Sequence, residues 1–323
     1  MRPVSFILTA FLFSLPAIAD EAPPEARNGK LKDLNGYFPF TPSATKEAWN
    51  ERAANVRRQV LVSMGLHPLP SRTPLQPVIH GKVDCGDYTV ERVILESMPG
   101  YYVTGSLYRP AKSEGPAPAV LCPHGHWNDG RFLKTPEGDI ATEIRTGGEA
   151  LPNNASSPLQ SRCATLARMG CVVFFYDMIG YADSIQLSYE LAHKFKQQRP
   201  EMNDAAQWGF FSPQAEGHLQ SIMGLQTWNS IRALDFVESL PGVDAKRIGV
   251  TGASGGGTQT FILGAVDPRP AAIFPCVMVS TAMQGGCTCE NASLLRVETG
   301  NVELAAVFAP KPLGMTAAND WTK

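Results

Sequence analysis

The feature that most restricts the fold of this chain is an apolar strand that leads into a glycine-rich turn and then into a helix. Residues 247–251 have the composition of a buried strand, the turn reads Gly-Ala-Ser-Gly-Gly from Gly252 to Gly256, and helix-forming residues follow at 258–263. A Gly-x-Ser-x-Gly turn in this setting is typical of a nucleophile elbow, in which a serine projects from a sharp bend. We therefore predict that Ser254 is a nucleophile, the alternative being a glycine-rich phosphate-binding turn.

Short apolar segments alternate with helical and loop-like segments along most of the chain. Strand patterns occur at residues 117–122, 171–176, 247–251 and 271–279, with a fifth from Pro312, and helical patterns at 219–240 and from Ser43 towards Gly65. Residues 88–95 and 101–108 alternate in polarity and predict an antiparallel hairpin. Residues 127–158 and 185–217 are polar and interrupted by Gly and Pro, which predicts loops over the strand ends. This order predicts an α/β fold with a mostly parallel sheet and helices on both faces.

The first residues have the pattern of a secretory signal peptide. Arg2 is positive, residues 4–15 are apolar, and Ala17-Ile18-Ala19 matches the small-x-small cleavage pattern. The apolar run is shorter than the roughly 20 residues that a membrane span needs, which favours a signal over an anchor. We predict cleavage after Ala19, a secreted or periplasmic protein, and no membrane span in the mature chain.

Charge and cysteine usage exclude further classes. A formal net charge of -2 provides no basic surface for a phosphate backbone, so we expect no nucleic-acid partner. The seven cysteines are odd in number, so at least one is free or pairs between chains. Cys287 and Cys289 are spaced more closely than a usual zinc-binding pair and no second pair follows. We therefore predict no metal and no cofactor.

Acyl transfer at Ser254 needs backbone amides that hold the developing oxyanion. The amide of Gly255, directly after the serine, is the first candidate. The second is the amide of His126, or of its neighbour Trp127, because this His-Gly-His segment follows the strand at 117–122. For the side chains of His124 and His126, loop-bracing hydrogen bonds, substrate contact and metal ligation all remain open.

Residues 170–184, the Ser254 turn and residues 310–323 together resemble bacterial acetylxylan-esterase-type α/β hydrolases, from about Val78 to the last residue. The resemblance implies an α/β-hydrolase fold, a triad of Ser, acid and His, and removal of acetyl groups from plant polysaccharide. Related groups cleave other carbohydrate esters or peptides. The expected organisation is a signal peptide at 1–19, a leader and helical segment at 20–77, and the hydrolase domain at 78–323.

Asp320 is the expected acid of the triad, because it follows the strand that begins at Pro312 and matches the acid of the family's Asp-Trp-Thr run. Glu290 is the alternative acid, and a helix-capping role for Asp320 is also open. Asp177 and Asp183 are expected to brace turns beside the site. The expected substrate contacts are His124, Trp127 and Trp321.

The sequence shows no candidate for the base in the expected order of Ser, acid and His. All of its histidines precede Ser254, namely His67, His80, His124, His126, His193 and His218. We expect the base on a segment beyond residue 323, so that the last strand and its His loop are missing from this sequence. The alternatives are that His124, His126 or His218 serves as the base, or that catalysis is lost.

The expected function is that of an exported serine hydrolase that cleaves carboxylic esters, acetyl or related groups on plant polysaccharide, with a small-molecule or polysaccharide ester as substrate. One alternative is a serine peptidase of the prolyl-oligopeptidase type, which shares the elbow. The other is a non-catalytic carbohydrate-binding homologue that uses Trp127, Trp208 and Trp321 as stacking surfaces.

Overall fold

The computed structural model describes residues 37–193, 213–282 and 284–318. All of them lie in the compact unit Lys32–Lys323. Several predicted features lie outside the described residues, namely the signal peptide, residues 20–36 of the leader and helical segment, Trp208, Asp320 and Trp321.

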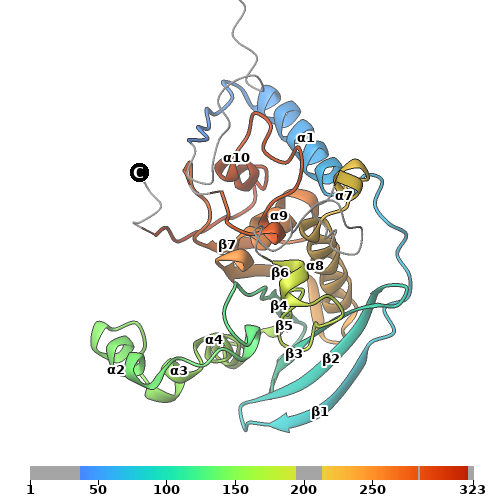
Figure 1. Cartoon of the computed structure of the whole chain (residues 1–323). Helices are drawn as coiled ribbons and strands as arrows, with labels where there is room; N and C mark the ends of the chain where they lie inside the picture. The colour runs from blue at the N-terminus through green and yellow to red at the C-terminus, as the bar shows by residue number, and fades with distance from the viewer. Residues whose placement is uncertain (1–36, 194–212, 283, 319–323) are drawn as a thin grey trace, which may run out of the picture. The chain divides into compact units, whose positions relative to one another are not determined.

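A seven-stranded sheet in the order β1-β2-β3-β5-β4-β6-β7 forms the centre of the described chain (Figure 1). The strands are β1 (Val78–Asp84), β2 (Tyr88–Met98), β3 (Tyr101–Pro110), β4 (Ala117–Leu121), β5 (Val172–Tyr176), β6 (Val243–Ala253) and β7 (Ala272–Cys276). β1, β2, β3 and β5 pair antiparallel in succession, whereas β5, β4, β6 and β7 pair in parallel. β2 therefore shares its direction with β4 to β7. The predicted hairpin and the mostly parallel sheet are both confirmed.

The predicted strand from Pro312 is present only as isolated bridges. Ile273 pairs in parallel with Leu313, and Cys276 pairs with Thr316. The Thr316 backbone thus follows the edge of β7 without forming a continuous ladder.

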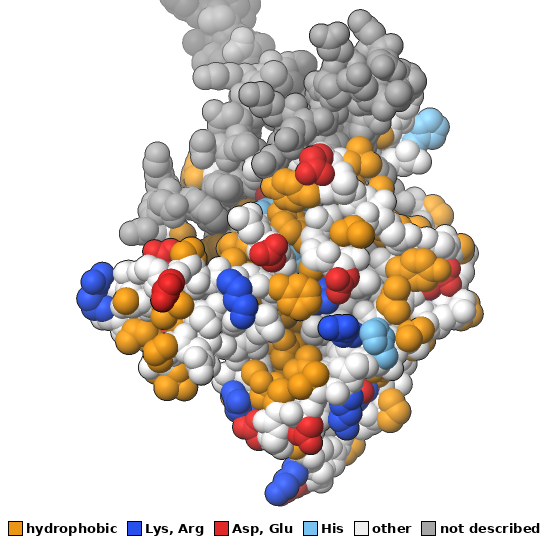
Figure 2. Space-filling model, turned by 60° about the horizontal axis from the view of Figure 1, so that its bottom comes forward, with side chains coloured by type: hydrophobic (Ala, Val, Ile, Leu, Met, Phe, Trp, Pro, Cys, Tyr) orange, Lys and Arg blue, Asp and Glu red, His pale blue; other side chains and the backbone are white. Residues whose placement is uncertain are grey.

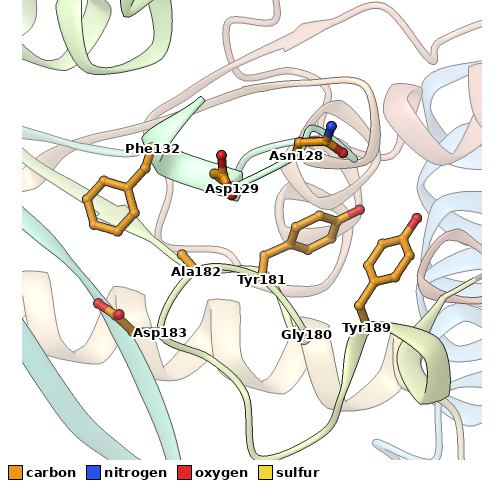
Figure 3. A pocket seen from close by; sticks show the side chains of 8 residues that line it. All are labelled: Asn128, Asp129, Phe132, Gly180, Tyr181, Ala182, Asp183 and Tyr189. Carbon is orange, nitrogen blue, oxygen red and sulfur yellow. The ribbon is translucent and has the colours of Figure 1, made fainter. Parts of the chain in front are cut away.

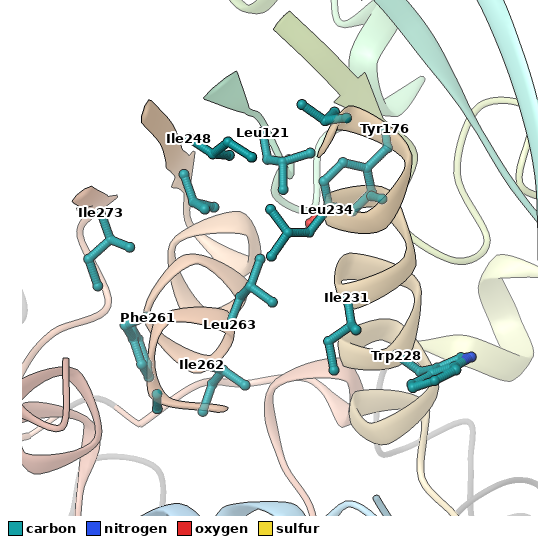
Figure 4. Close-up of a cluster of buried hydrophobic side chains, with 14 of the residues drawn as sticks. Leu121, Tyr176, Trp228, Ile231, Leu234, Ile248, Phe261, Ile262, Leu263 and Ile273 are labelled. Atoms are coloured by element: carbon teal, nitrogen blue, oxygen red, sulfur yellow. The ribbon is translucent and has the colours of Figure 1, made fainter. Parts of the chain in front are cut away.

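Helices cover both faces of the sheet, as predicted. One face packs against α8 (Ile222–Ser239) and α9 (Gly255–Val266), with α1 (Lys46–Ser63) and α10 (Asn301–Ala306) joining the same hydrophobic core. Figure 4 shows this core, where Leu234 and Leu263 from the two helices face Leu121 and Ile248 of the sheet. The other face packs against α4 (Pro158–Arg168) through a second apolar cluster. Burial of these apolar side chains is the main force that fixes the layers.

Two segments that we predicted to be loops contain short helices, which corrects that prediction. The first holds a 3-10 turn (Gly130–Phe132), α2 (Glu137–Thr146), α3 (Pro152–Ser156) and the start of α4. The second holds α5 (Tyr189–Ala192) and α7 (Pro213–Gly217). α2 buries none of its side chains, so it has no apolar stripe that a periodicity argument could detect.

The surface in Figure 2 mixes hydrophobic, acidic and basic side chains. On the described part of this face no broad area carries a single sign of charge, in keeping with the small net charge. Among the described residues, no helix is long and apolar enough to cross a membrane.

Candidate active site

Ser254 stands at the junction of β6 and α9 in a backbone conformation that is rare for a residue with a side chain. Its φ is 55° and its ψ is -127°, and its N–H donates to the carbonyl of Cys276 at 3.2 Å. Such conformations cost about 1–3 kcal/mol and persist where the surrounding structure imposes them. The turn places the serine at the positive N-terminal end of α9.

The glycines on either side of Ser254 pack against the loop that follows β4. A Cβ atom at Gly252 would lie 2.5 Å from the carbonyl oxygen of Pro123 and 2.6 Å from that of Gly256. A Cβ atom at Gly256 would overlap the same Pro123 oxygen and lie 3.0 Å from the carbonyl carbon of His124. Both positions therefore require glycine for steric reasons.

The segment after β4 lies directly against the serine. A Cβ atom at Gly125 would lie 2.7 Å from the Cβ of Ser254, and one at Gly255 would lie 2.8 Å from Cε1 of His126. In the part of the chain that the structure describes, neither the Gly255 amide nor the His126 amide donates a hydrogen bond. The two predicted oxyanion donors thus belong to segments that meet at the Ser254 turn.

The His124 side chain braces this loop from inside the protein. It is fully buried, its Nδ1 donates to the carbonyl of Gly125 at 2.8 Å, and its Nε2 accepts from the amide of Met178 at 3.1 Å. Burial lowers the pKa of this imidazole to about 3. The geometry therefore favours loop bracing over the substrate contact that we expected for His124.

A buried ion pair joins the loops after β4 and β5. The guanidinium of Arg131 contacts the buried carboxylate of Asp177 and, at 2.5 Å, the more exposed carboxylate of Asp183. Arg131 also donates to Ser106 at 3.1 Å, and Thr104 donates to Asp177 at 2.6 Å. Burial raises the pKa of Asp177 to about 6, against the opposing effect of Arg131. These contacts agree with the bracing role expected for Asp177 and Asp183.

We predict that Arg131→Met lowers the free energy of unfolding by about 3–5 kcal/mol, because it leaves the Asp177 carboxylate buried without its cation. The loss should be smaller at pH 5 than at pH 8, since without Arg131 the pKa of Asp177 rises further and the carboxyl is protonated at the lower pH. Urea unfolding at the two pH values measures both effects.

Arg168→Met is the matched control for that prediction. It breaks the Arg168–Asp87 pair, in which both side chains are about half exposed (47% and 55%). We expect its effect to stay below about 1 kcal/mol. If Arg131→Met and Arg168→Met lowered the free energy of unfolding equally, the buried Arg131–Asp177 pair would contribute no more to stability than an exposed pair.

Glu290, the alternative acid, is buried behind the serine turn. One oxygen of its carboxylate accepts from the amides of Gly286 and Cys287, at 3.0 and 3.2 Å. The other accepts from Thr258 of α9 at 3.4 Å. Burial raises the pKa of this carboxyl group. Within the described residues, Glu290 makes no hydrogen bond to a histidine.

A cavity of about 560 Å³ opens between the loops that follow β4 and β5. Figure 3 shows Asn128, Asp129 and Phe132 on one side and Tyr181 and Ala182 on the other. The lining also includes Gly180, Asp183 and Tyr189. The lining contains neither His124 nor Trp127, but it begins at Asn128, next to Trp127. The sequence offered no periodic signal for a cavity built from two loops.

The structure brings together four further side chains that our sequence analysis did not combine. They are His126, His193, Cys287 and Cys289, and their nitrogen and sulfur atoms all lie within 4.8 Å of one another. Our sequence analysis weighed metal ligation separately for the cysteine pair and for the His124–His126 segment, and did not consider His193, whereas in the structure the histidines come from two other loops. No local spacing rule could have found this cluster.

A family model described as acetyl xylan esterase (AXE1) matches residues 227–281, which contain most of α8, strand β6, the Ser254 turn, α9 and β7. Among solved structures, methylesterase BT1017 is similar with a TM-score of 0.64 and 30% identity, over 87% of this chain and 54% of that one. The chain has an α/β-hydrolase fold and is similar to esterases of the acetylxylan type. The fold class and the resemblance inferred from the sequence are therefore confirmed.

Two curated relatives share shorter or weaker similarity with this α/β hydrolase. The 4-O-methyl-glucuronoyl methylesterase 1 of Sodiomyces alcalophilus is 32% identical over 100 residues, which are 30% of this chain and 19% of that protein. The hydrolase candidate YtaP of Bacillus subtilis (strain 168) is 26% identical over 221 residues, 67% of this chain and 61% of that one. The chain spans less than two thirds of the length of these relatives.

Proposed function

We propose that this protein is an exported serine esterase that removes acetyl groups from plant polysaccharide. The observation that supports this most directly is the strained backbone of Ser254 at the N-terminus of α9, within the segment that matches the acetyl xylan esterase family. A serine in such a turn is preorganised to attack a carbonyl carbon.

In the proposed reaction, the Ser254 oxygen attacks the ester carbonyl and the sugar alcohol leaves after accepting a proton. Water then attacks the acyl-enzyme and releases acetate. The amides of Gly255 and His126 would hold the oxyanion in both steps, since neither is used elsewhere among the described residues. Each lost donor of this kind typically costs about 100- to 1,000-fold in rate.

The acid and the base complete the proposed triad. Asp320 remains our choice for the acid, and Glu290 the alternative. In the described part of the chain, no hydrogen bond joins the Ser254 oxygen to a histidine, and His124 has both ring nitrogens bonded inside the protein. We therefore propose that His124 is not the base.

The cavity between the β4 and β5 loops suits a sugar. Its Asn128, Asp129 and Asp183 offer hydrogen-bonding groups, and the rings of Tyr181 and Tyr189 offer apolar surface. The Tyr181 and Tyr189 rings meet edge to face at 5.2 Å. Because the cavity lining carries both polar and aromatic groups, we propose that the cavity receives the sugar that bears the ester.

The test is hydrolysis of a matched substrate set by the full-length gene product. We expect the highest kcat/KM on acetylated xylan fragments. The second candidate substrate is a methyl ester of a uronic acid, favoured by the similarity of this chain to methylesterase BT1017 and to the 4-O-methyl-glucuronoyl methylesterase of Sodiomyces. Turnover of a prolyl peptide, or tight polysaccharide binding without turnover, would replace the esterase proposal by one of its rivals.

We predict that Gly125→Ala lowers kcat/KM by about 100-fold or more, because displacing a reacting group by about 1 Å has an effect of that size. Its new Cβ would lie 2.7 Å from the Cβ of Ser254 and 2.9 Å from the carbonyl oxygen of Ala253. Gly115→Ala is the control, since nothing lies within 4 Å of its Cβ position. Full activity in Gly125→Ala would show that the loop after β4 does not position the serine.

A further inference from the structure

We propose that His126, His193, Cys287 and Cys289 bind one structural zinc ion. These residues come from the loops after β4, β5 and β7, at the edge of the sheet where Ser254 lies. Cys287, Cys289 and His193 are at most 6% exposed, and His126 is partly buried. The proposal does not depend on which ester the protein cleaves.

The distances suit a single ion between the four side chains. Nε2 of His126 lies 2.9 Å from Sγ of Cys289, and Nδ1 of His193 lies 3.1 Å from Sγ of Cys287. In tetrahedral zinc sites with Zn–N of about 2.0 Å and Zn–S of about 2.3 Å, the donor atoms lie roughly 3.3 to 3.8 Å apart. The separations here, from 2.9 to 4.8 Å, bracket that range.

The donor types favour zinc over harder cations. Two thiolates and two imidazoles form the closed four-ligand set of structural zinc sites, whereas Mg²⁺ and Ca²⁺ prefer oxygen ligands. The two thiolates would balance the charge of the ion, which lowers the cost of burying it.

Hydrogen bonds around the cluster hold its ligands in the required orientation. Nε2 of His193 contacts the carbonyl of Ile179 at 2.6 Å, which puts the ring proton on Nε2 and leaves the Nδ1 lone pair facing Cys287. Such a bond from the second ring nitrogen to a carbonyl is common for metal-bound histidine. Thr288, between the cysteines, donates to the carbonyl of Ala192 at 2.7 Å and so joins two of the ligand loops.

The position next to Ser254 gives the ion a consequence for the site. The ring of His126 packs against Gly255, and the Glu290 carboxylate that holds the Cys287 amide also contacts Thr258 of α9. With no open coordination position, the ion would stabilise the loops that surround the serine and would not contact substrate.

The first measurement is the metal content of the full-length protein by mass spectrometry, after purification without chelators. We expect about one zinc per chain. Cobalt exchanged into the protein should give the visible bands of tetrahedral Co²⁺ and a thiolate-to-cobalt charge-transfer band. Zinc removal with a chelator should lower the melting temperature, and added zinc should restore it.

Ligand variants test the four residues. Cys289→Ser and His193→Gln should each weaken zinc binding by about 100-fold or more, since even losses outside the first ligand shell cost about 10- to 100-fold. Cys85→Ser and His80→Gln, whose side chains lie outside the cluster, should bind zinc as wild type does.

The wild-type spectra keep the proposal testable if these variants fail to fold. The proposal is overturned if the folded protein takes up neither zinc nor cobalt, or if mass spectrometry finds a disulfide between Cys287 and Cys289. Zinc binding that persists in both ligand variants would also overturn it, because the ion would then lie elsewhere.

Discussion

Ser254→Ala is expected to lower the ester-hydrolysis rate of the full-length protein by at least about 10,000-fold, because it removes the attacking oxygen. The remaining rate should be that provided by the oxyanion donors and substrate binding alone. The fold should be unaffected, with the free energy of unfolding within about 0.5 kcal/mol of wild type, since alanine meets the same backbone constraint. Initial rates on an acetyl ester and urea unfolding measure the two quantities.

Two variants sharpen this test. Ser113→Ala removes an exposed hydroxyl that bonds to the nearby carbonyl of Gly115, and should leave the rate unchanged. Ser254→Gly should be as inactive as Ser254→Ala but more stable by about 1 kcal/mol, because glycine accepts the φ of 55° without strain. A fully active Ser254→Ala protein would show that Ser254 is not the nucleophile.

The second large effect is expected from Gly256→Val, which should prevent folding or abolish activity. The new Cβ would overlap the Pro123 carbonyl oxygen, and backbone on both sides of the contact leaves no flexible group that could move. Valine also adds two methyl groups on this Cβ, which enlarges the overlap. Soluble yield, circular dichroism and ester hydrolysis measure the outcome.

Gly138→Val is a closely matched control for Gly256→Val. Both glycines are the second residue of a helix, Gly138 in α2 and Gly256 in α9. Nothing lies within 4 Å of a Cβ atom at Gly138, so this variant should fold and retain its activity. If both variants folded and hydrolysed the ester as wild type does, the serine turn could not be in tight contact with the loop after β4.

The described structure has the strands, the main helices and the sharp serine turn that the sequence predicts. Each of these leaves a recognisable pattern in a short stretch of the sequence. Apolar periodicity identifies α8 and β5, and the steric demands of the bend explain the glycines around Ser254. The short helix α2 escaped prediction because it buries no side chain and so leaves no such pattern.

The amino-acid sequence by itself determined the fold class and the position of Ser254, because both follow from local sterics and from the alternation of apolar segments. Only the tertiary structure decided what surrounds the serine. His126 and Cys289 are 163 positions apart, and His193 and Cys287 are 94 apart, yet each pair is in contact. Such contacts form where the parallel strands end together at one edge of the sheet, and the packing of the whole sheet, rather than any local spacing, sets which loops meet there.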